Sequence, residues 1–210
     1  QMNKYSIYFF YLICLSIVTG PLKAQEKSTL KSYKILFIGN SLTYSNNIPL
    51  LVSQVTSQNQ INVSTEMLAK PNYALIDQRD QVILADKIKN KSFDFVVVQQ
   101  GPSSQSEGRK LLFKSIKKLS QICEENKSQL AVFMVWPSRQ YYHTFDKVII
   151  NHREVAEKYN TILCPVGENW KAHFDKTNDF DYYGSDGFHP SQKGSQVAAK
   201  IIAESIFGKP

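Results

Sequence analysis

The chain has 210 residues, of which 42% are hydrophobic, and its formal net charge at pH 7 is +7. This length and apolar content predict one α/β domain with a full hydrophobic core, over residues 25–210. The basic excess is mild, and no stretch interleaves basic with aromatic residues as a nucleic-acid groove does, so we expect no nucleic-acid partner.

The N-terminal segment has the layout of a secretory signal peptide. Lys4 is followed by an apolar run over residues 5–18, and Gly20 and Pro21 precede the small residue Ala24. Such a run is shorter than the roughly 20 residues that a membrane-spanning helix needs. We therefore expect residues 1–24 to be removed, leaving a secreted or periplasmic protein without a stable membrane anchor.

Five short runs after this segment are predicted to be β-strands, because their apolar residues are nearly continuous and do not alternate with polar ones. They lie at residues 34–38, 61–67, 93–99, 130–136 and 161–164. Helical segments follow them at residues 48–57, 73–89, 108–126, 146–159 and 192–207. The alternation of strand and helix predicts a doubly wound, flavodoxin-like three-layer sandwich with a five-stranded parallel sheet.

Two motifs carry side chains suited to nucleophilic catalysis. The first strand runs into Gly-Asn-Ser-Leu-Thr at residues 39–43, which places the Ser41 hydroxyl at a strand-to-helix turn. Asp186 lies three residues before His189, so its carboxylate can accept from Nδ1–H and leave Nε2 as a base. Each motif alone fits an ordinary turn better, but both lie on carboxyl-edge loops that such a sheet can bring together.

Together the two motifs resemble the first and last sequence blocks of the SGNH (GDSL-type) hydrolases. In that superfamily an Asp or Asn precedes the nucleophilic serine, and an Asp and a His three residues apart are its partners. Residues 165–170 and 194–199 resemble a branch common in bacterial extracellular proteins, so the resemblance covers residues 33–207. It implies the SGNH hydrolase fold, with Ser41, Asp186 and His189 as the catalytic triad.

Two blocks that bind the oxyanion in this family are altered. Asn72 takes the position of a glycine whose N–H binds the oxyanion. Asn tolerates left-handed backbone angles, so its N–H can still point inward. An ordinary Pro-Asn turn is an equal alternative. The block that is ordinarily Gly-x-Asn-Asp is Gln-Gln-Gly-Pro at residues 99–102, similar to the Gln-Gly-Glu stretch of carbohydrate acetylesterases. The resemblance assigns the amide donor to Gln100, with Gln99 as the alternative, beside the Ser41 N–H. Both glutamines also fit ordinary polar residues at a strand end.

The resemblance implies a serine esterase that hydrolyses short acyl esters, with O-acetyl groups on an extracellular carbohydrate as the leading expectation. A lipase or thioesterase of the same superfamily remains open. A catalytically degenerate carbohydrate-binding protein also remains open, because the two sequence blocks that bind the oxyanion are altered. The intact set of Ser, Asp and His favours the enzyme, since a binding protein has no need for all three.

Two groups of side chains at the same edge fit either the walls of a sugar-binding cleft or packed loops. They are Trp136, Tyr141, Tyr142 and His143 after the fourth strand, and Asp179, Asp181, Tyr182 and Tyr183 before the triad loop.

Two cysteines, Cys123 and Cys164, remain once the signal segment is removed. A secreted protein meets an oxidising compartment, so one disulfide between them is allowed. No His or Cys pair has zinc-ligand spacing, and we expect neither a metal nor a cofactor.

Overall fold

A computed structural model of the chain describes residues 31–71, 75 and 82–209. The expected signal peptide and Asn72 lie outside these residues. Within them, the parallel strands form one five-stranded sheet in the order β2-β1-β3-β4-β5, which confirms the predicted fold class. The strands are β1 (Ser32–Gly39), β2 (Asn62–Ala69), β3 (Phe95–Val98), β4 (Gln129–Phe133) and β5 (Ile162–Cys164). The third and fourth strands end before the predicted apolar runs do.

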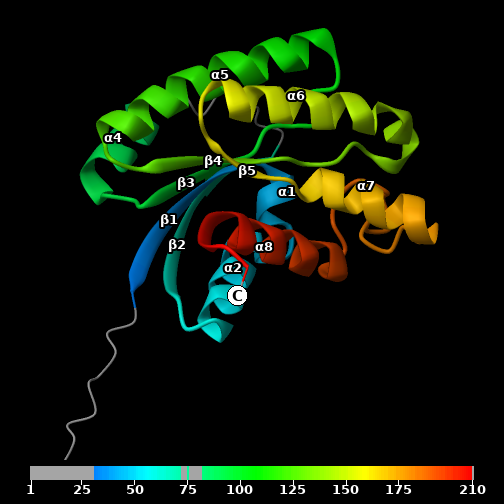
Figure 1. Ribbon diagram of the computed structural model, residues 1–210, viewed down its shortest axis with the longest axis horizontal. Helices are drawn as coiled ribbons and strands as arrows, with labels where there is room; N and C mark the ends of the chain where they lie inside the picture. Colours follow the sequence, from blue (N-terminus) through cyan, green and yellow to red (C-terminus); the bar gives the residue numbers. More distant parts are fainter. Residues whose placement is uncertain (1–30, 72–74, 76–81, 210) are drawn as a thin grey trace, which may run out of the picture.

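Helices cover both faces of this sheet (Figure 1). One face carries α4 (Val82–Lys91), α5 (Ser106–Glu125) and α6 (Phe145–Lys158), and the other carries α2 (Ile48–Gln58) and α8 (Gln192–Phe207). The sequence did not predict α1 (Ser41–Tyr44), η1 (Ser45–Asn47), η2 (Arg139–Thr144) or α7 (Val166–Thr177). In the described part of the chain, no helix is both long and apolar enough to span a bilayer.

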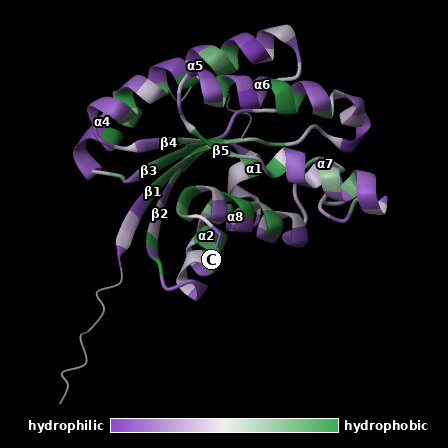
Figure 2. Cartoon of the chain, viewed as in Figure 1, coloured by the Kyte–Doolittle hydropathy of each residue, from purple (hydrophilic) through white to green (hydrophobic). Residues whose placement is uncertain are grey.

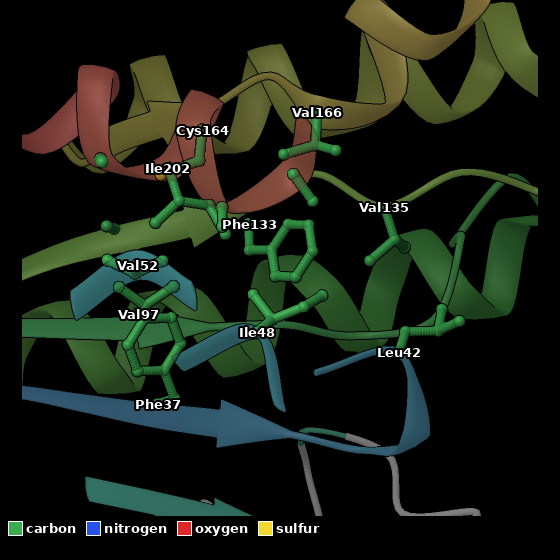
Figure 3. Packing of buried hydrophobic residues seen from close by; sticks show 14 of the residues in the cluster. Phe37, Leu42, Ile48, Val52, Val97, Phe133, Val135, Cys164, Val166 and Ile202 are labelled. Carbon is green, nitrogen blue, oxygen red and sulfur yellow. The ribbon is translucent and has the colours of Figure 1, made fainter. Parts of the chain in front are cut away.

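The central strands β1, β3 and β4 are buried on both faces, as their continuous apolar runs predicted, whereas the edge strand β2 buries only Val63 and β5 only Cys164. Phe37, Val97 and Phe133 point to the side of α2 and α8, where they pack with Ile48 and Ile202 (Figure 3). Neighbouring strand residues point to the opposite face and pack under α4 and α5 in a second cluster: Leu36, Ile38, Val96, Val98, Leu112 and Ile116. Hydrophobic strands therefore form the middle layer, between helices with hydrophilic outer faces (Figure 2).

The two cysteines are free and buried, so the allowed disulfide does not form in this structure. Cys164 belongs to the cluster beneath α8, whereas Cys123 on α5 belongs to the cluster on the opposite face. The sheet between them keeps the thiols apart. Burial raises the pKa of each thiol to about 12.

The strand order also marks where a ligand is expected. The chain passes from β1 to β2 on one side and then to β3 on the other, so the order reverses between the carboxyl ends of β1 and β3. In open parallel sheets, such a switch point opens a crevice that binds ligands. Ser41 follows β1 directly after Asn40, and Gln99 follows β3.

Candidate active site

The structure brings the three predicted triad side chains together at the carboxyl edge of the sheet. Ser41 is the first residue of α1, and His189 lies in the loop before α8. His189 Nε2 lies 2.9 Å from Ser41 Oγ, and His189 Nδ1 lies 2.5 Å from Asp186 Oδ2. These distances fit the contacts that acyl transfer to serine requires between a hydroxyl, a base and an orienting carboxylate.

A tight loop over residues 183–190 presents the carboxylate and the imidazole. Gly187 takes a left-handed φ of +66°, which glycine adopts at little steric cost. Asp186 Oδ1 accepts from the backbone N–H groups of Phe188 and His189, each at 2.9 Å, which leaves Oδ2 for the imidazole. The His189 side chain and then the Phe188 N–H hold the pKa of the Asp186 carboxyl below its usual range. The carboxylate therefore stays ionised at neutral pH.

A buried glutamine braces the turn that carries the nucleophile. Gln99 is 1% exposed, and its Oε1 accepts from the Asn40 N–H at 3.0 Å and from the Thr43 hydroxyl at 2.9 Å. Both donors flank Ser41 in the chain. Gly39 leaves room for this amide, because a Cβ at Gly39 would lie 2.6 Å from Gln99 Oε1. This bracing role of Gln99 was not predicted from the sequence.

The predicted oxyanion donors differ in whether their N–H groups are already engaged. As the first residue of α1, Ser41 has an N–H without an acceptor inside the helix. Both amide hydrogens of Gln100 are engaged, because its Nε2 donates to Ser103 Oγ at 3.0 Å and to Gly108 O at 3.1 Å. Gln99 Nε2 is buried without a hydrogen-bond partner among the described residues. The roles of Gln100, its alternative Gln99, and Asn72 thus stay predictions.

A cleft of about 790 Å³ lies beside the triad. Its walls come from the loop after β3, the segment after β4 and the triad loop: Pro102, Ser103, Ser104, Gln105, Gly108, Pro137, Ser138, Tyr141, His143, Thr144 and Phe188. Tyr141 and His143 thus line a cleft, as one of the two interpretations predicted. The other two aromatic side chains of that group are packed. Trp136 is fully buried and stacks on Trp170, with ring centroids 3.6 Å apart, and Tyr142 packs edge-on against Phe145.

The group before the triad loop follows the packed-loop interpretation. Tyr182 stacks on His173 with ring centroids 4.2 Å apart, and the buried Tyr183 donates to Pro137 O at 2.7 Å. His173, Asp179 and Asp181 place possible metal-ligand atoms within 4.8 Å of one another. Lys193 already pairs with the Asp181 carboxylate and is the main cause that lowers its pKa, so this charge is balanced without an ion.

The comparisons with known proteins concern the fold. No family model matches the chain, and no curated protein matches its sequence. Three similar solved structures come from hydrolases or candidate hydrolases. A candidate SGNH hydrolase from Slackia heliotrinireducens is 22% identical, with a TM-score of 0.71 over 84% of this chain and 100% of that one.

A candidate GDSL-like lipase from Parabacteroides merdae is 18% identical, with a TM-score of 0.67 over 86% of this chain and 98% of the other. A catalytic mutant of an acetylxylan esterase from Geobacillus stearothermophilus is 14% identical, with a TM-score of 0.66 over 86% of this chain and 96% of the other. This chain therefore has the fold of the SGNH hydrolases.

Proposed function

We propose that this protein is a serine esterase that removes short acyl groups, O-acetyl groups above all, from a carbohydrate. The observation that carries the proposal is the 2.9 Å hydrogen bond between His189 Nε2 and Ser41 Oγ, with Asp186 bound to the other ring nitrogen. The apolar run over residues 5–18 supports a further part of the proposal, that the protein acts outside the cytoplasm.

In the first step, Ser41 Oγ attacks the carbonyl carbon of the ester while His189 Nε2 takes the hydroxyl proton. The charged carboxylate of Asp186 stabilises the imidazolium that forms. The negative oxygen of the tetrahedral intermediate would accept from the Ser41 N–H, and one such donor is typically worth about 100-fold to 1000-fold in rate. His189 then gives its proton to the departing sugar oxygen, which leaves an acyl group on Ser41.

In the second step, water attacks the acyl carbon and His189 takes one of its protons. Collapse of the intermediate breaks the bond to Ser41 Oγ, and His189 returns the proton to this oxygen. The carboxylic acid leaves, and the resting state is restored. The two steps use only these side chains and water.

Two observations support an acetylated carbohydrate as the substrate. The cleft beside the triad is mainly apolar, with the exposed Tyr141 ring and several Ser, Thr and Gln residues in its lining, and such a surface can stack a sugar ring. The solved structures that share this fold include an acetylxylan esterase. A carbohydrate-binding protein without turnover is the second candidate, because the Gln100 amide is engaged elsewhere.

Hydrolysis of p-nitrophenyl acetate by the purified protein and by Ser41→Ala separates the two candidates. Removal of a triad serine usually lowers turnover on the order of a million-fold, so the variant should fall to the background rate. Ser57→Ala, which changes an exposed serine on α2, serves as the matched control and should match the unmodified protein. Equal rates for the unmodified protein and Ser41→Ala would sink the esterase proposal.

A further inference from the structure

The cleft beside the triad indicates which class of substrate the proposed esterase acts on. The inference drawn from this cleft rests on that proposed function. We infer that the cleft binds the sugar that leaves during acylation, that this sugar is uncharged, and that Tyr141 is the surface on which its ring stacks. Tyr141 is accordingly a specificity-determining residue.

The position of the cleft follows from the proton transfer. His189 must protonate the departing oxygen, so the leaving group lies on the imidazole side of Ser41. Phe188 lines the cleft, and its ring packs edge-on against that of His189, with centroids 5.2 Å apart. The triad loop is also tied to the cleft wall, because the Trp136 indole N–H donates to Phe188 O at 2.9 Å and the Arg139 N–H donates to Gly187 O at 2.8 Å.

The chemistry of the lining selects an uncharged sugar. The residues that line the cleft include no Asp, Glu, Lys or Arg, so a charged sugar would lose its hydration without meeting a counter-ion. Ser103, Ser104, Gln105, Ser138 and Thr144 belong to the same lining, where the Thr144 hydroxyl donates to Tyr141 O at 2.8 Å and the Ser103 hydroxyl donates to Gly101 O at 2.9 Å. The polar side chains of Ser104, Gln105 and Ser138 can bond sugar hydroxyls, whereas a long acyl chain offers them no hydrogen bond.

Tyr141 is presented to this cleft from a fixed backbone. Its N–H donates to Ser138 O at 2.9 Å, and its carbonyl accepts from the Thr144 hydroxyl at 2.8 Å. Its side chain is nevertheless 55% exposed, while the next residue, Tyr142, packs against the core. An exposed ring on a rigid turn gives a ligand an apolar, preorganised face at a small entropic cost.

The opposite wall is held in a strained conformation. Ser103 has a left-handed φ of 56°, which is unfavourable for a residue with a side chain and is often found at ligand sites. Buried polar groups maintain it: Asn151 Nδ2 donates to Ser103 O at 2.8 Å, and Gln100 Nε2 donates to Ser103 Oγ at 3.0 Å. Arg109 in turn donates to Asn151 Oδ1 at 2.6 Å. Both walls of the cleft are therefore shaped before a ligand arrives.

The test compares ethyl acetate, whose leaving group is too small to stack on Tyr141, with an O-acetylated xylo-oligosaccharide, which is uncharged. Tyr141→Ala should lower kcat/KM for the oligosaccharide by about tenfold or more, mainly through KM, because the ring on which the sugar stacks is lost. Its rate on ethyl acetate should stay within about twofold. Tyr141→Phe should behave as the unmodified protein does, since the ring face remains. Ile150→Ala, which removes a 52% exposed side chain on α6, is the matched control.

An equal loss on both esters would overturn the inference, since Tyr141 would then support the site as a whole, and so would no loss on the oligosaccharide. Faster hydrolysis of p-nitrophenyl octanoate than of p-nitrophenyl acetate, abolished by Tyr141→Ala, would assign the cleft to the acyl chain. If Ser41→Ala keeps full activity, the esterase proposal fails instead. If the protein hydrolyses no ester, calorimetric titration of xylo-oligosaccharide into Ser41→Ala tests sugar binding by itself. Binding that an added Tyr141→Ala change weakens supports the inference, and absence of binding refutes it.

Discussion

The side-chain oxygen of Gln99 occupies the space that a side chain at Gly39 would need, since a Cβ there would lie 2.6 Å from Gln99 Oε1. That oxygen accepts from the Asn40 N–H and the Thr43 hydroxyl, on either side of Ser41. The end of the first strand and the end of the third are thus joined through a buried amide. This junction sets where the nucleophile stands relative to His189.

Gly39→Ala should disturb this junction. The added Cβ would lie 2.3 Å from Thr43 Oγ1 as well as 2.6 Å from Gln99 Oε1, so the amide must move and leave buried donors unpaired. We expect a loss of about 1–3 kcal/mol in the free energy of unfolding and a fall in kcat. Urea unfolding and p-nitrophenyl acetate hydrolysis measure the two effects. Gly101→Ala is the control, because a Cβ at Gly101 meets no atom within 4 Å. If Gly39→Ala and Gly101→Ala behaved alike, the close packing of Gly39 against Gln99 would contribute neither to stability nor to turnover.

The two adjacent glutamines should give different kinetic defects. Gln99→Ala removes the acceptor that fixes the nucleophile turn, and a small misplacement of reacting groups costs on the order of 100-fold, so kcat for p-nitrophenyl acetate should fall by about that factor. Gln100→Ala releases Ser103 and Gly108. It should raise KM for the acetylated xylo-oligosaccharide and spare kcat on p-nitrophenyl acetate. A loss of about 100-fold to 1000-fold confined to Gln100→Ala would instead establish Gln100 as the oxyanion donor.

Asp186→Asn should separate the chemistry of the triad from the shape of its loop. The new amide oxygen can still accept from the N–H groups of Phe188 and His189, so thermal stability should change little. Its NH₂ group, however, then faces His189 Nδ1 and favours the tautomer that carries the proton on Nε2. That imidazole cannot take the Ser41 proton, and kcat should fall by about 1000-fold to 10,000-fold. Near-normal turnover in the folded variant would show that Asp186 does not orient the base.

The parts of the fold that were predictable are those that depend on local pattern. The five apolar runs predicted β1 to β5, and for the central strands β1, β3 and β4 the reason is that strands buried on both faces need continuous apolar residues. Helix α7 was not predicted, although Val166, Trp170 and Phe174 recur at four-residue intervals and all are buried. Pro165 and Gly167 at its start weaken the helical signal, and the tertiary contacts of the Trp170 ring outweigh that weakness.

The site, like the fold, has one part that local sequence could predict and another that depends on tertiary structure. The Asp186–His189 spacing is local and could be interpreted directly, whereas the contact of His189 with Ser41, 148 residues away, required the fold class first. The choice between Gln99 and Gln100 could not be made. Successive residues of an extended chain point in opposite directions, so the direction of each amide depends on where β3 ends. In the structure, Gln99 faces the turn after β1 and Gln100 faces the loop before α5.

A histidine outside the site should make the stability of the protein depend on pH. His152 on α6 is fully buried, its Nδ1 bonds Val148 O at 2.8 Å, and burial lowers its pKa to about 4. The unfolded chain binds a proton at this residue below about pH 6.5, whereas the folded chain does so only near pH 4. Between these values the unfolded state binds more protons, so the free energy of unfolding falls as the pH falls, by about 2 kcal/mol from pH 7 to about pH 5.

His152→Leu removes this proton uptake while it fills a similar volume. Its unfolding free energy, measured by urea titration across the same pH range, should therefore depend on pH less steeply than that of the unmodified protein, by about 2 kcal/mol in total. His143→Leu replaces an exposed histidine and should keep the steeper dependence. If His152→Leu and the unmodified protein lose stability in parallel as the pH falls, proton uptake by other groups governs the acid sensitivity, and the buried imidazole does not contribute.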